Sequence, residues 1–302
     1  MGAIAFVFSG QGDQYPGMGK ELCDTYAAAA AVFHMCEVLR PGTVRQCFEG
    51  TADELKETKN TQPCLFAMEM AAAEVLMDKG IMPNAVAGFS LGEVVAATVA
   101  GIFDRETGFK LISKRGELMQ TESEQYDTAM AAVVKLTTQQ VCELTAKYDR
   151  LYPVNFNCPG NITVSGLVEQ MRAFSADVKA AGGRALPLKV KGAFHSPFMA
   201  NAAAAFGVEL EKLTLGKPKL PLYSNVTTQP YDADPAQLLA KQIESPVQWE
   251  NIIRNMIASG IDTFIEIGPG KTLTNIIKKI DLTVKAYTFA QYLEENPFPE
   301  GS

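Results

Sequence analysis

The sequence predicts an α/β fold in which a mostly parallel sheet, surrounded by helices, is interrupted by a small inserted subdomain. Short apolar segments alternate with segments of helical periodicity at both ends of the chain, which is typical of a parallel sheet. Between about residues 125 and 192 the expected order becomes βαββαβ, the pattern of a ferredoxin-like unit. One apolar strand runs directly into a serine flanked by glycines, at Ser90.

The N-terminal part begins with Ala3–Phe8, an apolar run that is too short for a signal peptide core and is expected to be a buried strand. Glycines mark residues 9–19 as a loop. This loop lacks the Gly-Lys-Ser/Thr ending of a phosphate loop, and Tyr15 stands where a dinucleotide fingerprint needs its last glycine. A strand is expected just before Ser90, and helices are expected over Glu21–Leu39, Ala52–Thr58, Gln62–Lys79, Val94–Ala100 and Asp104–Gln120.

The inserted subdomain, residues 125–192, is expected to hold strands at Thr128–Leu136, Tyr152–Asn157, Ile162–Ser165 and Arg184–Val190, with helices at Thr137–Tyr148 and Leu167–Ala181. The larger domain takes residues 1–124 and 193–302. Its later part is expected to hold helices over Pro197–Leu213, Pro235–Gln242 and Trp249–Ser259, strands at Leu220–Ser224 and Asp262–Ile267, and a last helix after Gly270. The tail after Glu294 is expected to be loose.

The composition describes an ordinary globular protein and excludes several classes of function. With 302 residues, 47% of them hydrophobic, the chain is large enough for one sizeable core and an insertion. A formal net charge of −7 argues against attraction to nucleic acid or to an anionic membrane, and no apolar run approaches transmembrane length. The six cysteines form no C-x-x-C pair and no disulfide framework, which predicts a cytoplasmic protein with reduced thiols and no metal site.

Ser90 is predicted to be a nucleophile. It lies in a G-x-S-x-G pattern between an apolar strand and an Ala/Val-rich helix, where glycines on both sides permit the strained turn that exposes a serine hydroxyl. The free N–H groups at the start of a helix favour an oxyanion at this place. The alternative is a tight turn with an incidental serine, because the pattern also recurs by chance.

A serine hydroxyl usually needs a general base, and the chain has two histidines. His34 lies in an alanine-rich helical segment, which favours a structural role. His195 lies in a loop between the inserted subdomain and the larger domain, where active sites concentrate, so we predict that His195 is the base. A structural role for His195 is the alternative.

The order of these two residues narrows the class of serine enzyme. In an α/β-hydrolase the acid comes between the serine and the histidine, and the histidine lies close to the C-terminus, whereas roughly a hundred residues follow His195. The Asp-Gly pair that a patatin-like dyad uses is absent from the sequence.

Six motifs in order closely resemble those of malonyl-CoA:acyl carrier protein transacylases, and they span nearly the whole chain. Each motif is weak alone, but the order and spacing of all six are specific. They are Gly10-Gln11-Gly12, Gly88-Phe89-Ser90-Leu91-Gly92-Glu93, Arg115-Gly116 with Met119-Gln120, Asn155-Phe156-Asn157-Cys158-Pro159-Gly160, Ala193-Phe194-His195 and Glu266-Ile267-Gly268-Pro269-Gly270. The resemblance implies a hydrolase-like large domain with a ferredoxin-like insertion.

The resemblance also implies a ping-pong mechanism. Ser90 would attack the thioester of malonyl-CoA while His195 takes its proton, which gives a malonyl ester and free CoA. The phosphopantetheine thiol of an acyl carrier protein would then reverse the step. The backbone N–H groups of Gln11 and Leu91 would hold the oxyanion.

The remaining site residues follow from the same resemblance. Arg115 would bind the malonyl carboxylate as a bidentate fork, and an ion pair on a helix surface, with Glu117 or Glu122, is the alternative. No aspartate obviously completes a triad, so Gln242 is expected to supply the carbonyl that orients His195. Asn157 and Gln62 match positions that line the site in the family. No permanently bound cofactor is expected.

Two departures from the family pattern concern acyl specificity. Most relatives have histidine before the nucleophile, whereas this chain has Phe89, which makes the pocket more apolar. Relatives that use malonyl groups commonly show His-Ala-Phe-His, and Gly192 replaces the first histidine here. Phe194 is kept, and its bulk would crowd a 2-methyl branch, so malonyl is favoured over methylmalonyl.

Two other functions fit the same residues. The chain could be an acyl-thioester hydrolase that proofreads a polyketide line, or a non-catalytic docking module for carrier proteins, although the presence of both Ser90 and His195 disfavours the second. Because CoA and carrier proteins are both acidic, a local basic rim is expected, with Lys189, Lys191 or Lys271 in it.

Overall fold

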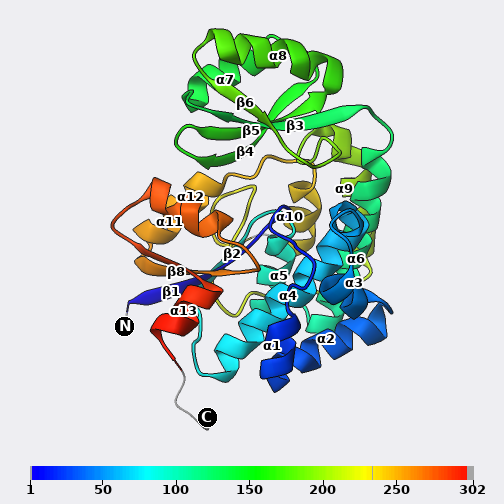
Figure 1. Ribbon diagram of the computed structural model, residues 1–302, viewed down its shortest axis with the longest axis vertical. Coiled ribbons are helices and arrows are strands. Elements are labelled where there is room, and N and C mark those ends of the chain that lie inside the picture. The colour runs from blue at the N-terminus through cyan, green and yellow to red at the C-terminus, as the bar shows by residue number, and fades with distance from the viewer. Residues whose placement is uncertain (1, 233, 298–302) are drawn as a thin grey trace.

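The computed structural model describes residues 2–232 and 234–297, and these residues form two sheets. One sheet has five strands, all parallel, and the other has four, all antiparallel. Figure 1 shows the four-stranded sheet at one end of the molecule, above the larger part that holds the parallel sheet. The predicted α/β class, with a mostly parallel sheet and an inserted ferredoxin-like unit, is confirmed.

The parallel sheet separates two cores. Its strand order is β7 (Leu222–Tyr223), β2 (Ala85–Gly88), β1 (Ala3–Phe8), β8 (Ile261–Ile267) and β9 (Lys285–Thr288). Because successive residues of a strand point to opposite faces, Ala5 and Val7 pack in one core while Phe6 and Phe8 pack in the other. The first core is closed by α11 (Trp249–Ala258) and α12 (Thr272–Ile280).

The second core is built around α4 (Thr58–Asp78), a helix that is buried along most of its length. Small and apolar residues occupy most sides of α4, so it can pack against the sheet and against other helices at once. The other helices that share this core are α1 (Lys20–Thr25), α2 (Ala27–Leu39), α3 (Thr43–Glu49), α5 (Gly92–Val99), α6 (Arg105–Ser123), α9 (Ala200–Glu211), α10 (Pro235–Gln242) and α13 (Phe289–Glu295).

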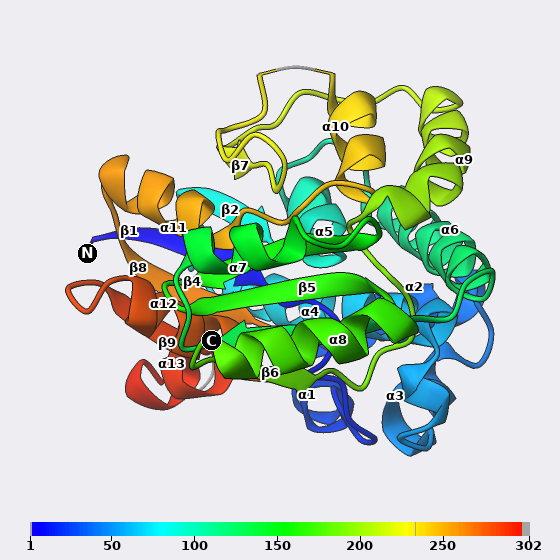
Figure 2. The ribbon, with the colours of Figure 1, turned by 90° about the horizontal axis from the view of Figure 1, so that it is seen from above.

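The antiparallel sheet has the order β4 (Leu151–Cys158), β5 (Asn161–Leu167), β3 (Thr128–Val134) and β6 (Arg184–Pro187). Two helices, α7 (Thr138–Thr145) and α8 (Val168–Ala180), pack on its outer face, as Figure 2 shows from above. The edge strand β4 contacts the larger part, where Phe156 N–H donates to Val247 O at 2.9 Å. That residues 125–192 form a separate subdomain, and the remaining residues the larger domain, stays a proposal.

Several predicted elements are wrong in extent. The helix expected over 21–39 is two helices, because Tyr26 has extended backbone (φ −123°, ψ 123°), and the helix expected over 52–58 is a 3-10 turn, Glu54–Lys56. The helices α3 and α13 and the strand β9 were not predicted. The loose tail expected after Glu294 falls largely on residues 298–302, which lie outside the described residues. Within the described ranges, no helix is long and apolar enough to cross a membrane.

Candidate active site

Ser90 lies on a strained turn between β2 and α5. Its φ of 55° is in the left-handed region, which non-glycine residues rarely adopt. A Cβ at Gly88 would lie 1.9 Å from the carbonyl carbon of Gly92, and a Cβ at Gly92 would lie 2.5 Å from Phe8 O. The two glycines around Ser90 are therefore required by direct contact between the turn, the helix and strand β1.

His195 lies against this serine. Its Nε2 is 2.7 Å from Ser90 Oγ, and its Nδ1 is 3.0 Å from the main-chain oxygen of Gln242. A carbonyl oxygen only accepts hydrogen bonds, so Nδ1 carries the hydrogen and Nε2 is left to accept one from Ser90. His195 comes from the loop after β6 and Ser90 from the parallel sheet, so the pair joins the two parts of the fold.

The surroundings of His195 keep its imidazole neutral. Burial, and next the positive charge of Arg115, lower the pKa of His195 to about 4, although backbone hydrogen bonds with Gln242 and Ser245 act in the opposite direction. The side chain is only 3% exposed. At neutral pH the ring is therefore able to accept a proton from the serine.

Arg115 extends from α6 into the same site and is 1% exposed. Its Nη2 lies 3.3 Å from Ser90 Oγ and 2.8 Å from Gln242 Oε1, and its Nη1 donates to Gln62 Oε1 at 2.9 Å. Burial lowers the pKa of Arg115 to about 10, so the group stays charged at neutral pH. Its Nε has no hydrogen-bond partner among the described residues. The alternative of an ion pair on a helix surface is wrong, because this side chain is enclosed.

Gln242 contacts the site in two ways. Its main-chain carbonyl faces His195, whereas its side chain donates from Nε2 to Ser90 O at 2.6 Å and accepts from Arg115. Gln62, on α4, lies behind Arg115 and also contacts Met119 Sδ at 3.4 Å. Both glutamines thus hold the guanidinium group of Arg115.

Gln11 and Leu91 lie where the two loops of the sheet's carboxyl edge meet. Gln11 follows β1 and Leu91 follows Ser90 after β2, and β1 and β2 are neighbours in the sheet. In the part of the chain that the structure describes, neither backbone N–H has a hydrogen-bond partner. Two free N–H donors beside a nucleophile are the components of an oxyanion hole.

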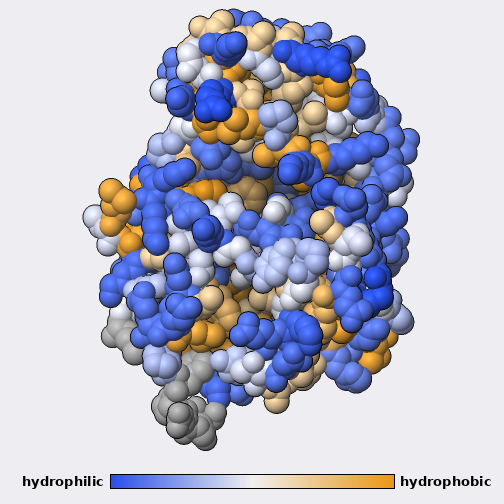
Figure 3. Space-filling view, in the orientation of Figure 1, coloured by the Kyte–Doolittle hydropathy of each residue, from blue (hydrophilic) through white to orange (hydrophobic). Residues whose placement is uncertain are grey.

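A cavity of about 290 Å³ opens beside these loops, between the two sheets. Polar side chains of β4 and β5 form one wall, and apolar side chains, including Phe89, form the other. The ring of Phe89 packs edge to face on Trp249, with ring centres 5.4 Å apart. Figure 3 shows that this face of the molecule is hollowed between its two parts, with hydrophobic residues in the recess. The lining residues include Gly10, Gln11, Asp13, Phe89, Asn155, Asn157, Asn161, Thr163, Leu188, Thr272, Leu273 and Ile276.

Two asparagines in this wall differ in their hydrogen bonds. Asn157 donates to Asn161 Oδ1 at 3.1 Å and to Thr163 Oγ1 at 3.3 Å. The side-chain oxygen of Asn155 is buried and has no partner among the described residues. Asn155 therefore lines the cavity while its side-chain oxygen stays buried and unpaired.

Phe194 is 6% exposed and directly precedes His195. A Cβ at Gly192 would lie 2.9 Å from the Phe194 ring and 2.9 Å from Ser123 Cβ, and the φ of Gly192 is 130°. A larger residue at 192 would therefore strain the backbone and displace Phe194, which explains why glycine accompanies this arrangement of Phe194.

Asn225, which was not among the predicted site residues, holds the backbone of the turn at Ser90. Asn225 Oδ1 accepts from Ser90 N–H at 2.9 Å, its Nδ2 donates to Gly88 O at 2.6 Å, and its N–H donates to Glu93 Oε1 at 3.1 Å. Burial raises the pKa of Glu93 to about 7, and Tyr231 donates to the same oxygen at 2.7 Å. The sequence offered one sign of this role. Asn225 follows a strand that was expected to end at the same edge of the sheet as the strand before Ser90.

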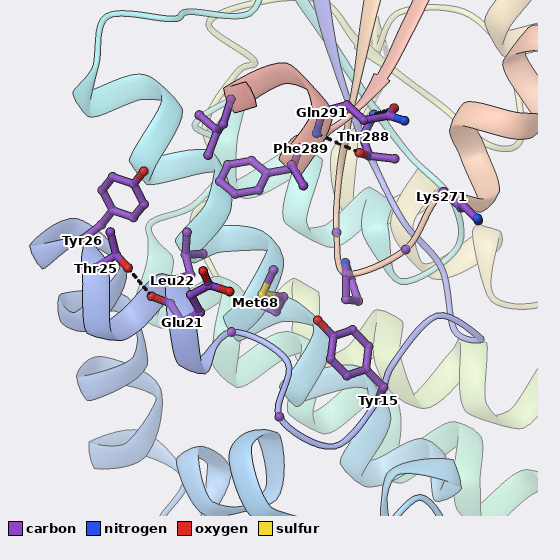
Figure 4. A pocket seen from close by; sticks show the side chains of 17 residues that line it. Tyr15, Glu21, Leu22, Thr25, Tyr26, Met68, Lys271, Thr288, Phe289 and Gln291 are labelled. Carbon is purple, nitrogen blue, oxygen red and sulfur yellow. Dashed lines mark hydrogen bonds between the residues drawn. The ribbon is translucent and has the colours of Figure 1, made fainter. Parts of the chain in front are cut away.

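A second cavity, of about 670 Å³, lies between α1, α13 and the loop at Gly268–Lys271. Figure 4 shows Tyr15, Met68 and Phe289 around it. None of the predicted site residues lines this cavity. The size of a cavity therefore does not identify the active site. The contact of Ser90 with His195 and Arg115 identifies it.

A parallel sheet with a serine on the turn into a helix, and a histidine on the serine hydroxyl, defines the class of α/β enzymes that carry an acyl group on a serine. Within that class, this chain belongs to the acyl transferase domain family, whose pattern matches residues 5–291.

Individual relatives cover almost the whole chain. The malonyl CoA-acyl carrier protein transacylase of Bacillus subtilis (strain 168) is 37% identical over 293 residues, which are 94% of this chain and 92% of that protein. The solved malonyl CoA-acyl carrier protein transacylase of Clostridium perfringens has a TM-score of 0.91 at 36% identity, covering 95% and 92% of the two chains. A malonyl-transacylase solved in complex with a type II PKS acyl-carrier protein has a TM-score of 0.93 at 31% identity, covering 97% and 100%.

Proposed function

We propose that this protein is a malonyl-CoA:acyl carrier protein transacylase, which supplies malonyl groups for fatty acid or polyketide synthesis. The observation that carries the acyl group's identity is Arg115, a buried cation 3.3 Å from the hydroxyl of Ser90. A guanidinium at this place matches an acyl group that ends in a carboxylate, and it has little use for an acyl chain without charge. The relatives described above carry the same activity in their names.

In the proposed mechanism, Ser90 is the nucleophile and His195 the general base. As Ser90 Oγ attacks the thioester carbon, His195 Nε2 takes its proton, and the N–H groups of Gln11 and Leu91 stabilise the oxyanion. The C–S bond then breaks and His195 returns the proton to the CoA sulfur. The carrier's thiol repeats these steps in reverse, so that the malonyl group leaves Ser90 as a new thioester.

The cavity beside Ser90 is proposed to hold the pantetheine arm that CoA and the acceptor share. Such an arm carries amide groups and methyl groups, and the cavity has a wall of asparagine and threonine opposite a wall of Phe89, Leu273 and Ile276. Phe194 is proposed to limit branching at the acyl carbon.

The reaction is proposed to take place in the cytoplasm. The six cysteines have the spacing of free thiols rather than of a disulfide framework, which is usual in a reducing compartment. The acceptor is proposed to be an acyl carrier protein, as in the complex of the relative noted above.

Mass spectrometry of the protein after incubation with malonyl-CoA tests the function. We expect a malonyl adduct on Ser90, absent in Ser90→Ala, and its loss when a carrier protein bearing phosphopantetheine is added. A competition among malonyl-, methylmalonyl- and acetyl-CoA should favour malonyl. An absence of adduct would refute the proposal, whereas an adduct released to water and not to the carrier would indicate the hydrolase alternative.

A further inference from the structure

The loop that carries Gln11 is joined to the core by a buried hydrogen bond that the proposed mechanism does not use. Ser9 Oγ lies 2.5 Å from Glu69 Oε1, and the two residues are 1% and 0% exposed. Glu69 lies on α4, among apolar residues. Burying a carboxyl group costs free energy unless it is hydrogen-bonded, so this pair requires an explanation.

Glu69 depends on Ser9 for its hydrogen bond. Burial raises the pKa of Glu69 well above its ordinary value, and the neighbouring carboxyl groups of Glu266 and Asp13 act in the same direction. Glu266 is occupied with α12, because its two oxygens accept from Leu273 N–H at 2.9 Å and Thr274 N–H at 2.8 Å. The second oxygen of Glu69 has no partner among the described residues. A neutral Glu69 is therefore tied to its surroundings through Ser9.

Ser9 in turn lies between the two loops of the oxyanion hole. It precedes Gln11 by two positions, and a Cβ at Gly92, the residue after Leu91, would lie 2.7 Å from Ser9 O. On the other side, a Cβ at Gly268 would lie 2.3 Å from Ser9 Oγ. Ser9 thus contacts the nucleophile turn with its backbone and Glu69 with its side chain.

The far side of the Gln11 loop is held separately. Gly12 N–H donates to Gln14 Oε1 at 2.7 Å, and Thr272 Oγ1 donates to Asp13 Oδ1 at 2.7 Å. Figure 4 shows Tyr15 from this loop, Lys271 from the loop before α12, and Met68 from α4 around one cavity. Gln11 therefore lies between two attachments, and the Ser9–Glu69 bond is the buried one.

We propose that Ser9 and Glu69 are positioning residues of the oxyanion hole. Their hydrogen bond fixes the backbone of the loop, so that the Gln11 N–H stays aimed, beside the Leu91 N–H, at the position of the developing oxyanion. This inference rests on the proposed function of Gln11 and Leu91. It adds two residues that touch no substrate and act through the backbone.

Ser9→Ala tests the proposal directly. Because the oxyanion contact is made in the transition state, we expect kcat for malonyl transfer to fall about 10- to 100-fold with little change in KM; loss of a whole oxyanion donor costs about 10²- to 10³-fold. Glu69→Gln keeps a neutral side chain with an oxygen that accepts from Ser9, so its rate should stay within about threefold of the parent. A full rate in Ser9→Ala would overturn the proposal.

A double variant separates positioning from stability. Ser9→Ala removes the hydroxyl that donates to the buried Glu69 and should lower Tm, whereas Ser9→Ala with Glu69→Leu removes the buried carboxyl group as well and should recover much of the loss. The rate should stay low in the double variant, because the buried side-chain attachment of the Gln11 loop is still missing. If the transfer rate of the double variant recovered together with its Tm, Ser9 and Glu69 would have only a structural role. Thr145→Val, which removes a buried hydroxyl bond to Val141 O in α7, is the matched control.

The rate at which an activated ester, p-nitrophenyl acetate, acylates Ser90 gives an independent readout. Acylation by this ester needs the oxyanion hole but no malonyl group, carrier or Arg115. Slower acylation in Ser9→Ala than in Thr145→Val supports the inference, whether or not the parent uses malonyl-CoA. If the parent fails to use malonyl-CoA while this difference is seen, only the proposed function is refuted. Equal rates in these two variants and the parent refute the inference.

Discussion

Arg115 is the single residue on which the choice of acyl group depends most. Arg115→Lys keeps the charge but loses the planar fork that reaches Gln62 and Gln242 together. We expect kcat/KM for malonyl-CoA to fall about 10- to 100-fold, the size of a lost hydrogen bond to a charged group. With acetyl-CoA, which has no carboxylate, the change should be less than about fivefold.

Arg105→Lys is the control for this comparison, because Arg105 begins the same helix and pairs with Glu74 at 3.3 Å while about half exposed. Its rates with both donors should match those of the parent. Equal losses for malonyl- and acetyl-CoA in Arg115→Lys would contradict a carboxylate clamp and would assign Arg115 a purely structural role around Ser90.

The titration of His195 gives a second prediction at this scale. Since burial and Arg115 lower its pKa to about 4, the imidazole should remain neutral, and the acylation rate constant, from its pH profile, should stay level from pH 8 down to about pH 5 and fall by half near pH 4. The chain has two histidines, and His34 is exposed, so His34→Gln leaves one imidazole to follow by NMR. A midpoint near 6.5 would contradict the prediction.

The same pKa sets the direction of acid destabilisation. The folded pKa of about 4 lies below the ordinary value of 6.5, so the unfolded chain binds the proton more readily between these values. The contribution of His195 therefore lowers the free energy of unfolding as pH falls from about 6.5 towards 4, by roughly 3 kcal/mol in total. Above about pH 6.5 the titration of His195 does not change the free energy of unfolding.

Residue types with rare chemistry were predictable from the sequence, whereas residues that act through position were not. His195 is one of only two histidines, Ser90 lies in a G-x-S-x-G pattern, and Arg115 was expected from its place in a family motif. Asn225 was missed because asparagine is common in loops, and its importance comes from contacts with a turn 135 positions away. No local pattern marks such a contact.

At the scale of elements, the strand-turn-helix unit around Ser90 depends on close contact with β1. Gly92→Ala would place a methyl group 2.5 Å from Phe8 O and 2.7 Å from Ser9 O, which are backbone atoms that cannot rotate away. We expect a loss of stability of about 2 to 3 kcal/mol or failure to fold, measured by urea unfolding, because overpacking must shift the backbone.

Gly207→Ala is the matched control for this change. Gly207 lies within α9, where an added Cβ would meet Ala240 Cβ at an ordinary 3.5 Å. Alanine is the better helix former, so this variant should be as stable as the parent or more stable by about 0.5 to 1 kcal/mol. If Gly92→Ala and Gly207→Ala had the same free energy of unfolding, the backbone of the turn at Ser90 would tolerate displacement.

The errors in the predicted elements have a common physical cause. Elements with clear periodicity and length, such as α4, α6 and the strands of the inserted unit, were found from the sequence. The missed elements, α3, β9 and α13, have seven, four and seven residues. Such short elements gain their stability from packing against the rest of the fold, so their own sequence carries little signal.

At the scale of the whole molecule, two parts of the fold supply one site. The parallel sheet provides Ser90, Gln11 and Leu91 at its carboxyl edge, the usual place for ligands in such sheets. The segment that leaves the antiparallel sheet provides His195. The cleft between the two parts, which holds the 290 Å³ cavity, is therefore where we propose that the arm shared by CoA and carrier proteins binds.

The surface around this cleft leads to a last prediction. Lys189 and Lys191 are exposed and follow Leu188, which lines the cavity, and Lys271 is exposed beside Thr272 on the opposite side. Since the chain as a whole carries a charge of −7, an acidic carrier must be attracted locally. Lys189→Glu with Lys191→Glu should raise KM for the carrier about 5- to 10-fold at low salt with kcat unchanged.

The control for this experiment reverses two charges in the same part of the fold but on its outer side. Lys147 follows α7 and Lys179 lies in the last turn of α8; both are exposed, and these two helices cover the outer face of the antiparallel sheet. Reversing both should leave KM for the carrier at its parent value, because charges beyond about 10 Å are screened at 0.1 M salt. Since both variants change the net charge by the same amount, a KM that rises equally in the two would assign the effect to overall repulsion and would exclude a docking rim at the cleft. A KM that rises only with Lys189 and Lys191, and whose rise disappears at high salt, would place the carrier at the mouth of the cavity that Gln11 and Phe89 line.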